Sequence, residues 1–109
     1  LKEKKRYMRY VENEEVIKDR SLDYVDFIRE QPCCVTGKEA EPHHLDALGM
    51  GANRKKPNIK HFTCIPLCRE IHTELHAKGI NYMQEKYRVQ FWEEAYYYCL
   101  KYFLTKILK

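Results

Sequence analysis

Apolar residues recur at helical spacing in the first third of the chain. Residues 5–31 predict a mostly helical segment, in which Ser21 is expected to cap the turn that leads into Val25 and Ile28. Pro32 has no backbone amide to donate, so we expect the helix to end before it.

Proline and glycine interrupt the middle of the chain, residues 32–66, and this pattern favours short strands and loops over long helices. We expect two short strands at 35–37 and 41–45, joined by a turn near 38–40. Residues 61–67 alternate weakly and predict a third extended piece.

The helical pattern returns after the middle segment. Residues 68–78 predict a helix that stops at Gly79, and residues 81–87 predict another short one. Residues 90–108 predict a long helix that is apolar on nearly every side. In so small a domain this indicates burial on more than one side, so we expect a protein partner or a second copy of the chain to contact this aromatic helix.

Composition is that of one globular domain, with 109 residues of which 44% are hydrophobic and 33% charged. No apolar run is long enough for a membrane span, and nothing resembles a signal peptide. The odd number of cysteines, five, is a poor disulfide framework. We therefore expect a reducing, cytoplasmic setting and no membrane partner. Because the chain begins with Leu1, we also expect it to be part of a longer protein.

Charge is unevenly distributed along the chain, which has a net charge of +4. Eight basic and eight acidic residues cancel in residues 1–31. Between 50 and 60 there are four basic residues and no acid: Arg54, Lys55, Lys56 and Lys60. A solvated loop would explain such a cluster alone, but its position among histidines favours binding to nucleic-acid phosphates.

The five histidines all lie between positions 43 and 76. His72 and His76 are four residues apart on the predicted helix, so their imidazoles can bind one metal ion. His43 and His44 are adjacent on a predicted strand and must point to opposite faces. One of this pair can complete a three-imidazole metal site while the other remains free as a general base. Three imidazoles favour borderline ions such as zinc, nickel or manganese.

A longer pattern joins these pieces, and it covers residues 33–90. It consists of 33–37 (CCVTG), 42–46 (PHHLD), 49–51 (GMG), 54–56 (RKK) and 65–76 (IPLCREIHTELH). In residue order and spacing this pattern resembles the HNH (ββα-metal, His-Me finger) nucleases of phages and prophages, including recombination-enhancing phage nucleases. The resemblance implies an α+β fold, in which a small ββα-metal core of two strands and a helix surrounds one divalent cation.

The resemblance also implies residue roles. His43, His72 and His76 match metal ligands, and His44 matches the general base. The middle position of the motif, which orients the base, falls on either Asn58 or His61, and the sequence leaves both open. Magnesium or manganese is the expected ion in function, although zinc or nickel can occupy such a site.

Many relatives carry a structural zinc knuckle of four cysteine or histidine ligands. Here Cys33 and Cys68 remain, whereas Thr36 and Ile71 stand at the other two positions. We therefore predict a degenerate, zinc-free knuckle, in which Cys33 and Cys68 lie together near Ile71. Replacement of the missing ligands by Cys34 and Cys64 is the alternative.

We divide the chain into a helical extension (1–31), an HNH nuclease core (32–89) and a C-terminal helix (90–109) that packs on the core or a partner. The leading hypothesis is a phage- or prophage-encoded endonuclease that hydrolyses DNA in a bacterial host cytoplasm, and the sequence leaves RNA open as an alternative substrate. The alternative is a catalytically inactive, metal-stabilised module that binds nucleic acid or a protein partner.

Overall fold

The described part of the chain begins with a helix. The computed structural model describes residues 14–49 and 54–108, and the part of the expected helix at 5–13 lies outside them. Helix α2 spans Glu14–Arg29 and ends shortly before Pro32, as the sequence predicts. Its buried residues are Ser21, Tyr24, Phe27 and Ile28, which recur at helical spacing.

Ser21 does not cap a helix, so that expectation was wrong. It lies within α2, fully buried, and its hydroxyl accepts a hydrogen bond from the backbone amide of Asn58 at 3.2 Å. Serine favours helix ends because its hydroxyl satisfies a free amide there. Here the amide that it satisfies comes from a distant segment instead.

The two strands are far apart in the sequence. Strand β1 (Glu41–His44) pairs antiparallel with β2 (Cys64–Leu67), so that His43 lies opposite Ile65 and His44 opposite Cys64. The expected strand at 35–37 is wrong, because residues 33–38 form a tight turn in which the amide of Cys33 bonds the carbonyl of Lys38 at 2.7 Å. The extended piece expected at 61–67 is confirmed only from Cys64 onward, because η1 (Ile59–Thr63) is a 3₁₀ helix.

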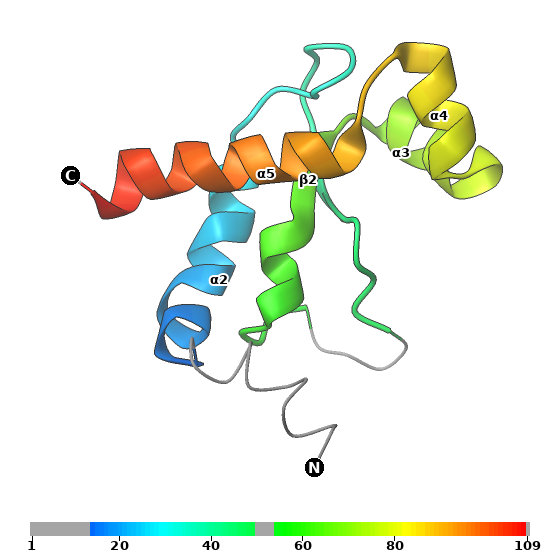
Figure 1. Cartoon of the computed structure of the whole chain (residues 1–109). Coiled ribbons are helices and arrows are strands. Elements are labelled where there is room, and N and C mark those ends of the chain that lie inside the picture. The colour runs from blue at the N-terminus through cyan, green and yellow to red at the C-terminus, as the bar shows by residue number, and fades with distance from the viewer. Residues whose placement is uncertain (1–13, 50–53, 109) are drawn as a thin grey trace.

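The helices after β2 follow the predicted pattern. Helix α3 spans Arg69–Lys78 and α4 spans Ile80–Tyr87. Gly79, with φ of 88°, allows the sharp change of direction between them. Helix α5 spans Phe91–Tyr102 and runs into a π-helical turn, η2 (Phe103–Ile107). Figure 1 shows α5 crossing over β2 while α3 and α4 form a separate pair at one end.

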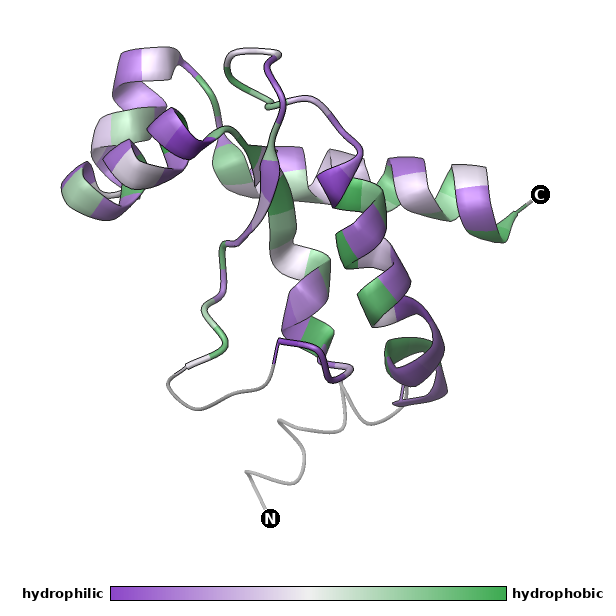
Figure 2. Ribbon diagram, turned by 180° about the vertical axis from the view of Figure 1, so that it is seen from behind, coloured by the Kyte–Doolittle hydropathy of each residue, from purple (hydrophilic) through white to green (hydrophobic). Residues whose placement is uncertain are grey.

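Strand β2 divides the core into two clusters because its side chains alternate between two faces. Ile65 and Leu67 join one cluster with residues of α3, α4 and α5, and Cys64 joins another with α2 and Tyr102. The green, hydrophobic part of α5 lies against this strand (Figure 2). Within the described residues the architecture is therefore α+β, with four α-helices around a two-stranded antiparallel sheet.

Only one face of α5 is buried within the chain. Phe91, Ala95 and Tyr102 are buried, whereas Trp92 and Tyr96 are 53% and 60% exposed. The C-terminal end of α5 and η2 extends past α2 in Figure 1. The partner expected on this helix stays a prediction.

None of the helices within residues 14–49 and 54–108 combines the length and the low polarity that a lipid bilayer would require.

Candidate metal centre

Strand β1 separates its two histidines onto opposite faces. Its four residues are half-buried, so their polar side chains are only partly exposed to solvent. His43 points toward α3, where its ring centroid lies 4.5 Å from that of His72. His44 points the other way and contacts His61 of η1, with ring centroids 5.1 Å apart. The division expected from strand geometry is therefore present.

Three imidazoles converge between β1 and α3. One ligand nitrogen from each of His43, His72 and His76 can be chosen so that all three lie within 4.8 Å of one another. His72 and His76 stack one turn apart on α3, with centroids 4.8 Å apart. Nitrogens that bind one first-row ion tetrahedrally at about 2.0–2.1 Å lie about 3.4 Å apart, and such a separation falls within this limit. The donor set fits one divalent ion with remaining positions open.

Glu41 orients one of these imidazoles, and the sequence analysis missed it. Its Oε1 accepts a hydrogen bond from Nδ1 of His72 at 2.9 Å, and its Oε2 accepts another from Arg69 at 3.0 Å. Because a carboxylate only accepts, the proton of neutral His72 must be on Nδ1, which leaves Nε2 free for a metal. Both hydrogen bonds hold the pKa of the Glu41 carboxyl below its usual value. The available signal was spacing, since Glu41 lies two residues before His43 and thus on the same face of β1.

The environment keeps His43 in the form that binds metal. Burial, together with the positive charges that His72, His76, His44 and Arg54 can carry, lowers the pKa of His43 to about 4. An imidazole must be neutral to offer its lone pair to a cation. His43 is therefore ready to bind at neutral pH without losing a proton.

On the opposite face of β1, His44 belongs to a short chain of hydrogen bonds. Its Nε2 lies 2.8 Å from Nδ1 of His61, and Nε2 of His61 lies 2.8 Å from the carbonyl oxygen of Lys56. A carbonyl only accepts, so His61 donates from Nε2 and, when neutral, accepts at Nδ1. His44 then donates from Nε2, and its Nδ1 keeps a lone pair.

Burial, together with charges on His61 and Arg54, lowers the pKa of His44 to about 4. At neutral pH this imidazole is therefore uncharged. Its free lone pair is in the unprotonated form that a general base requires.

The structure places His61, and not Asn58, beside His44. His61 is fully buried, whereas the side chain of Asn58 accepts from the backbone amide of Lys60 at 2.8 Å and so caps η1. Asn58 therefore shapes the segment that holds His61, since its carbonyl oxygen also accepts from the backbone amide of His61 at 3.0 Å. Of the two candidates for the middle position of the motif, His61 is the one whose side chain contacts His44, and its assignment to that position stays a prediction.

The basic residues expected to bind phosphate do not share one environment. Arg54 lines the cleft of about 340 Å³ that also contains His43, His44, His72 and His76. Lys55 and Lys56 are exposed, and the side chain of Lys55 also lines a shallow depression on α2 with Arg54 and Arg29. Of the four basic residues, Arg54 is therefore the one that lines the cleft together with the histidines.

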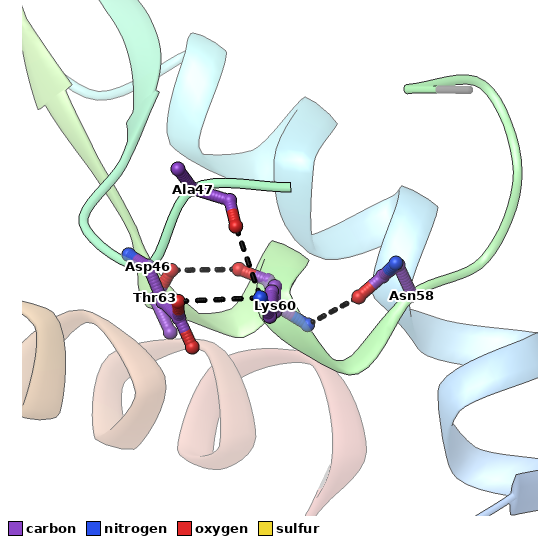
Figure 3. A network of polar contacts seen from close by, with 5 residues as sticks. All are labelled: Asp46, Ala47, Asn58, Lys60 and Thr63. Atoms are coloured by element: carbon purple, nitrogen blue, oxygen red, sulfur yellow. Dashed lines mark hydrogen bonds and ion pairs between the residues drawn. The ribbon is translucent and has the colours of Figure 1, made fainter. Parts of the chain in front are cut away.

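Lys60 is engaged in the fold instead. Its ammonium group donates to the carbonyl oxygen of Ala47 at 3.0 Å and lies 3.4 Å from Asp46 (Figure 3). The hydroxyl of Thr63 donates to the carbonyl oxygen of Lys60 at 2.7 Å. These contacts join η1 to the loop after β1, so Lys60 holds Ala47, which lines the cleft.

The predicted knuckle residues lie in one buried cluster. Cys33, Cys68 and Ile71 belong to the same part of the core, each at most 5% exposed. The hydroxyl of Thr36 donates to the sulfur of Cys68 at 3.4 Å. Within the described residues, neither Cys34 nor Cys64 belongs to a group of three or more side chains that could hold one metal ion.

Comparisons with known proteins give a family but no chemistry. A family described as "Protein of unknown function (DUF968)" matches residues 3–101. The chain is 35% identical over 68 residues to the "Uncharacterized protein YdfU" of Escherichia coli strain K12. That match covers 62% of this chain and 19% of YdfU, so the chain spans about a fifth of this relative's length. No solved structure matches the chain.

Proposed function

The chain belongs to the DUF968 family of proteins of unknown function, and we propose that it is an HNH-type endonuclease that uses a divalent metal ion to hydrolyse DNA. One observation carries the proposal: a three-imidazole site and a separate, hydrogen-bonded imidazole occupy opposite faces of the same short strand. A purely structural metal site has no use for a second imidazole held as a base beside it.

His43, His72 and His76 would hold the ion, with His72 oriented by Glu41. A divalent cation bound there supplies positive charge that polarises a phosphodiester and stabilises the departing 3′-oxygen. Magnesium or manganese is the proposed ion in function, and zinc or nickel fits the imidazole donors. In the resulting arrangement β1, β2 and α3 are the ββα-metal core.

His44 accepts the proton of the attacking water at Nδ1. Its Nε2–H bond to His61 fixes the ring and its tautomer, and the bond from His61 to the carbonyl of Lys56 fixes His61 in turn. As His44 gains positive charge, the lone pair of His61 Nδ1 stabilises it. His61 is therefore a positioning residue, whereas His44 is the catalytic base.

Arg54 provides the charge that holds the phosphate backbone over this site. It lines the same cleft as the four histidines, and its charge contributes to lowering the pKa of both His43 and His44. A guanidinium binds phosphate oxygens through two parallel hydrogen bonds, which fixes position without reading sequence.

Plasmid nicking with magnesium, manganese, nickel or zinc added separately tests the proposal. The wild-type chain should convert supercoiled plasmid to open circles with at least one ion. His44→Ala should reduce this rate by about 10²–10⁴-fold while metal affinity, measured by calorimetry, is retained. His72→Ala should lose metal affinity and cleavage together.

The second candidate, an inactive module that binds nucleic acid, makes a different prediction. It gives DNA binding without nicking under any of the four ions.

If the His44→Ala variant cuts as fast as wild type, the assignment of the base is wrong.

A further inference from the structure

Two of the five free cysteines are held together by backbone and hydroxyl groups. Cys33 lies in the tight turn at 33–38, and Cys68 is the residue before α3. The amide of Cys34 donates to the carbonyl of Pro66 at 3.0 Å, which attaches the turn to the end of β2. Thr36 donates to the sulfur of Cys68 at 3.4 Å and is also hydrogen-bonded to the sulfur of Cys33. Thr36 thus contacts both sulfurs, that of Cys68 through its hydroxyl and that of Cys33 through its backbone amide.

The sulfur of Cys33 accepts hydrogen bonds from two backbone amides. Those of Val35 and Thr36 each lie 3.4 Å from it. Burial raises the pKa of this thiol, but the hydrogen bonds from Thr36, Cys68 and Val35 outweigh burial and lower it to about 7. A thiolate is the nucleophilic form of cysteine.

The other three cysteines lack this environment. Burial raises the pKa of Cys34 and of Cys64 to about 12. Burial also raises the pKa of Cys99, whose thiol donates to the carbonyl of Phe62 at 3.1 Å. These sulfurs are held as neutral thiols, so the chain offers one nucleophilic sulfur and one neighbouring thiol.

We infer that Cys33 and Cys68 form a redox-active dithiol that hydrogen peroxide converts into an intramolecular disulfide. This inference goes beyond the proposed nuclease activity and does not depend on it. The pair is at most 5% exposed, which favours a small oxidant over a bulky disulfide. Thr36 is exposed and contacts the sulfur of Cys68, so the pair lies just below the surface.

The chemistry proceeds in two balanced steps. The Cys33 thiolate attacks one oxygen of the peroxide and breaks the O–O bond, which gives a sulfenic acid and, after protonation, one water. The thiol of Cys68 then attacks that sulfur, loses its proton and releases a second water as the S–S bond forms. Overall, two thiols are oxidised and one peroxide is reduced to two waters.

The bond would join the turn at 33–38 to Cys68, the residue that directly precedes α3, the helix that carries His72 and His76. Such a cross-link lowers the conformational entropy of the unfolded chain. Oxidation should therefore stabilise the folded state, in which α3 keeps its position. The expected consequence is a higher melting temperature for the oxidised protein than for the reduced one.

Peptide mapping of the whole chain tests the inference. Reduced protein is treated with hydrogen peroxide, free thiols are blocked under denaturing conditions, and tryptic peptides are sequenced by mass spectrometry without reduction. A cross-link about 2 Da lighter than the summed peptides should join residues 30–38 to residues 61–69, and fragmentation should place it on Cys33 and Cys68. Dithiothreitol should reverse it and lower the melting temperature again.

Cys33→Ala should abolish the cross-link, whereas Cys34→Ala, its matched neighbour, should keep it. A bond to Cys34 or Cys64, cross-links only between chains, or equal oxidation of all five cysteines in the wild type would overturn the inference. Since the wild-type map alone distinguishes these outcomes, a variant that fails to fold does not affect the conclusion.

Discussion

Glu41 on β1 accepts a hydrogen bond of 2.9 Å from Nδ1 of His72 on α3, and this contact joins the strand to the helix at the candidate metal site. It fixes the His72 tautomer that presents Nε2 to a cation. The same carboxylate is bonded by Arg69, so its position is set from two points on α3. The ligand geometry therefore depends on a residue outside the histidine motif.

Glu41→Gln is expected to weaken divalent metal binding by about 10–100-fold. The neutral amide of glutamine orients the His72 imidazole less firmly than a carboxylate does, and it raises the basicity of the imidazole less. Titration calorimetry with zinc and manganese measures the change. Glu39→Gln is the matched control, since Glu39 lies on the same segment and is exposed. Equal affinities for the two variants would show that Glu41 does not support the ligand.

The tautomers of three histidines are predicted without any substitution. In the metal-free protein at neutral pH, His44 and His61 should carry their proton on Nε2, and His72 should carry it on Nδ1. Long-range ¹H–¹⁵N correlation spectra of the imidazoles distinguish the two forms. A His44 protonated on Nδ1 would contradict the proposed base, because the lone pair would then face His61.

Arg54→Ala and Lys60→Ala should affect DNA binding differently. Arg54 lines the cleft, so its loss should weaken binding and reduce the slope of log affinity against log salt by about 1. Lys60 is held by Ala47 and Asp46, so its loss should leave that slope nearly unchanged and lower stability instead. Fluorescence anisotropy over a salt series measures both slopes. Equal slopes for the two variants would refute the distinction.

Ser21→Ala is expected to lower the free energy of unfolding by about 1–3 kcal/mol, because the backbone amide of Asn58 loses its buried acceptor. Urea denaturation followed by circular dichroism measures the difference. Lys18→Ala, at an exposed position of the same helix, should change stability by no more than about 0.5 kcal/mol. A similarly small effect at Ser21 would mean that water replaces its hydroxyl.

The sequence alone was sufficient for the helical half of the fold and for the gathering of His43, His72 and His76 into one group. Helices at 69–78 and 80–87 follow from local periodicity and from Gly79, which are properties of neighbouring residues. The pairing of His72 with His76 has the same origin, because one helical turn brings them onto one face. The opposite directions of His43 and His44 required only that the segment be extended.

Tertiary structure decided the remaining features, because each depends on a partner distant in the sequence. The strand at Glu41–His44 pairs with Cys64–Leu67 and not with 35–37, since strand pairing depends on which segments meet and not on local pattern. His61 reaches His44 only through that pairing, whereas Asn58, of the residue type usual for the motif, is used to cap η1. Ser21 is buried for the same reason, as the amide that it satisfies lies 37 residues away. Local periodicity fixes which residues share a face, but the contacts between faces depend on how the whole chain packs.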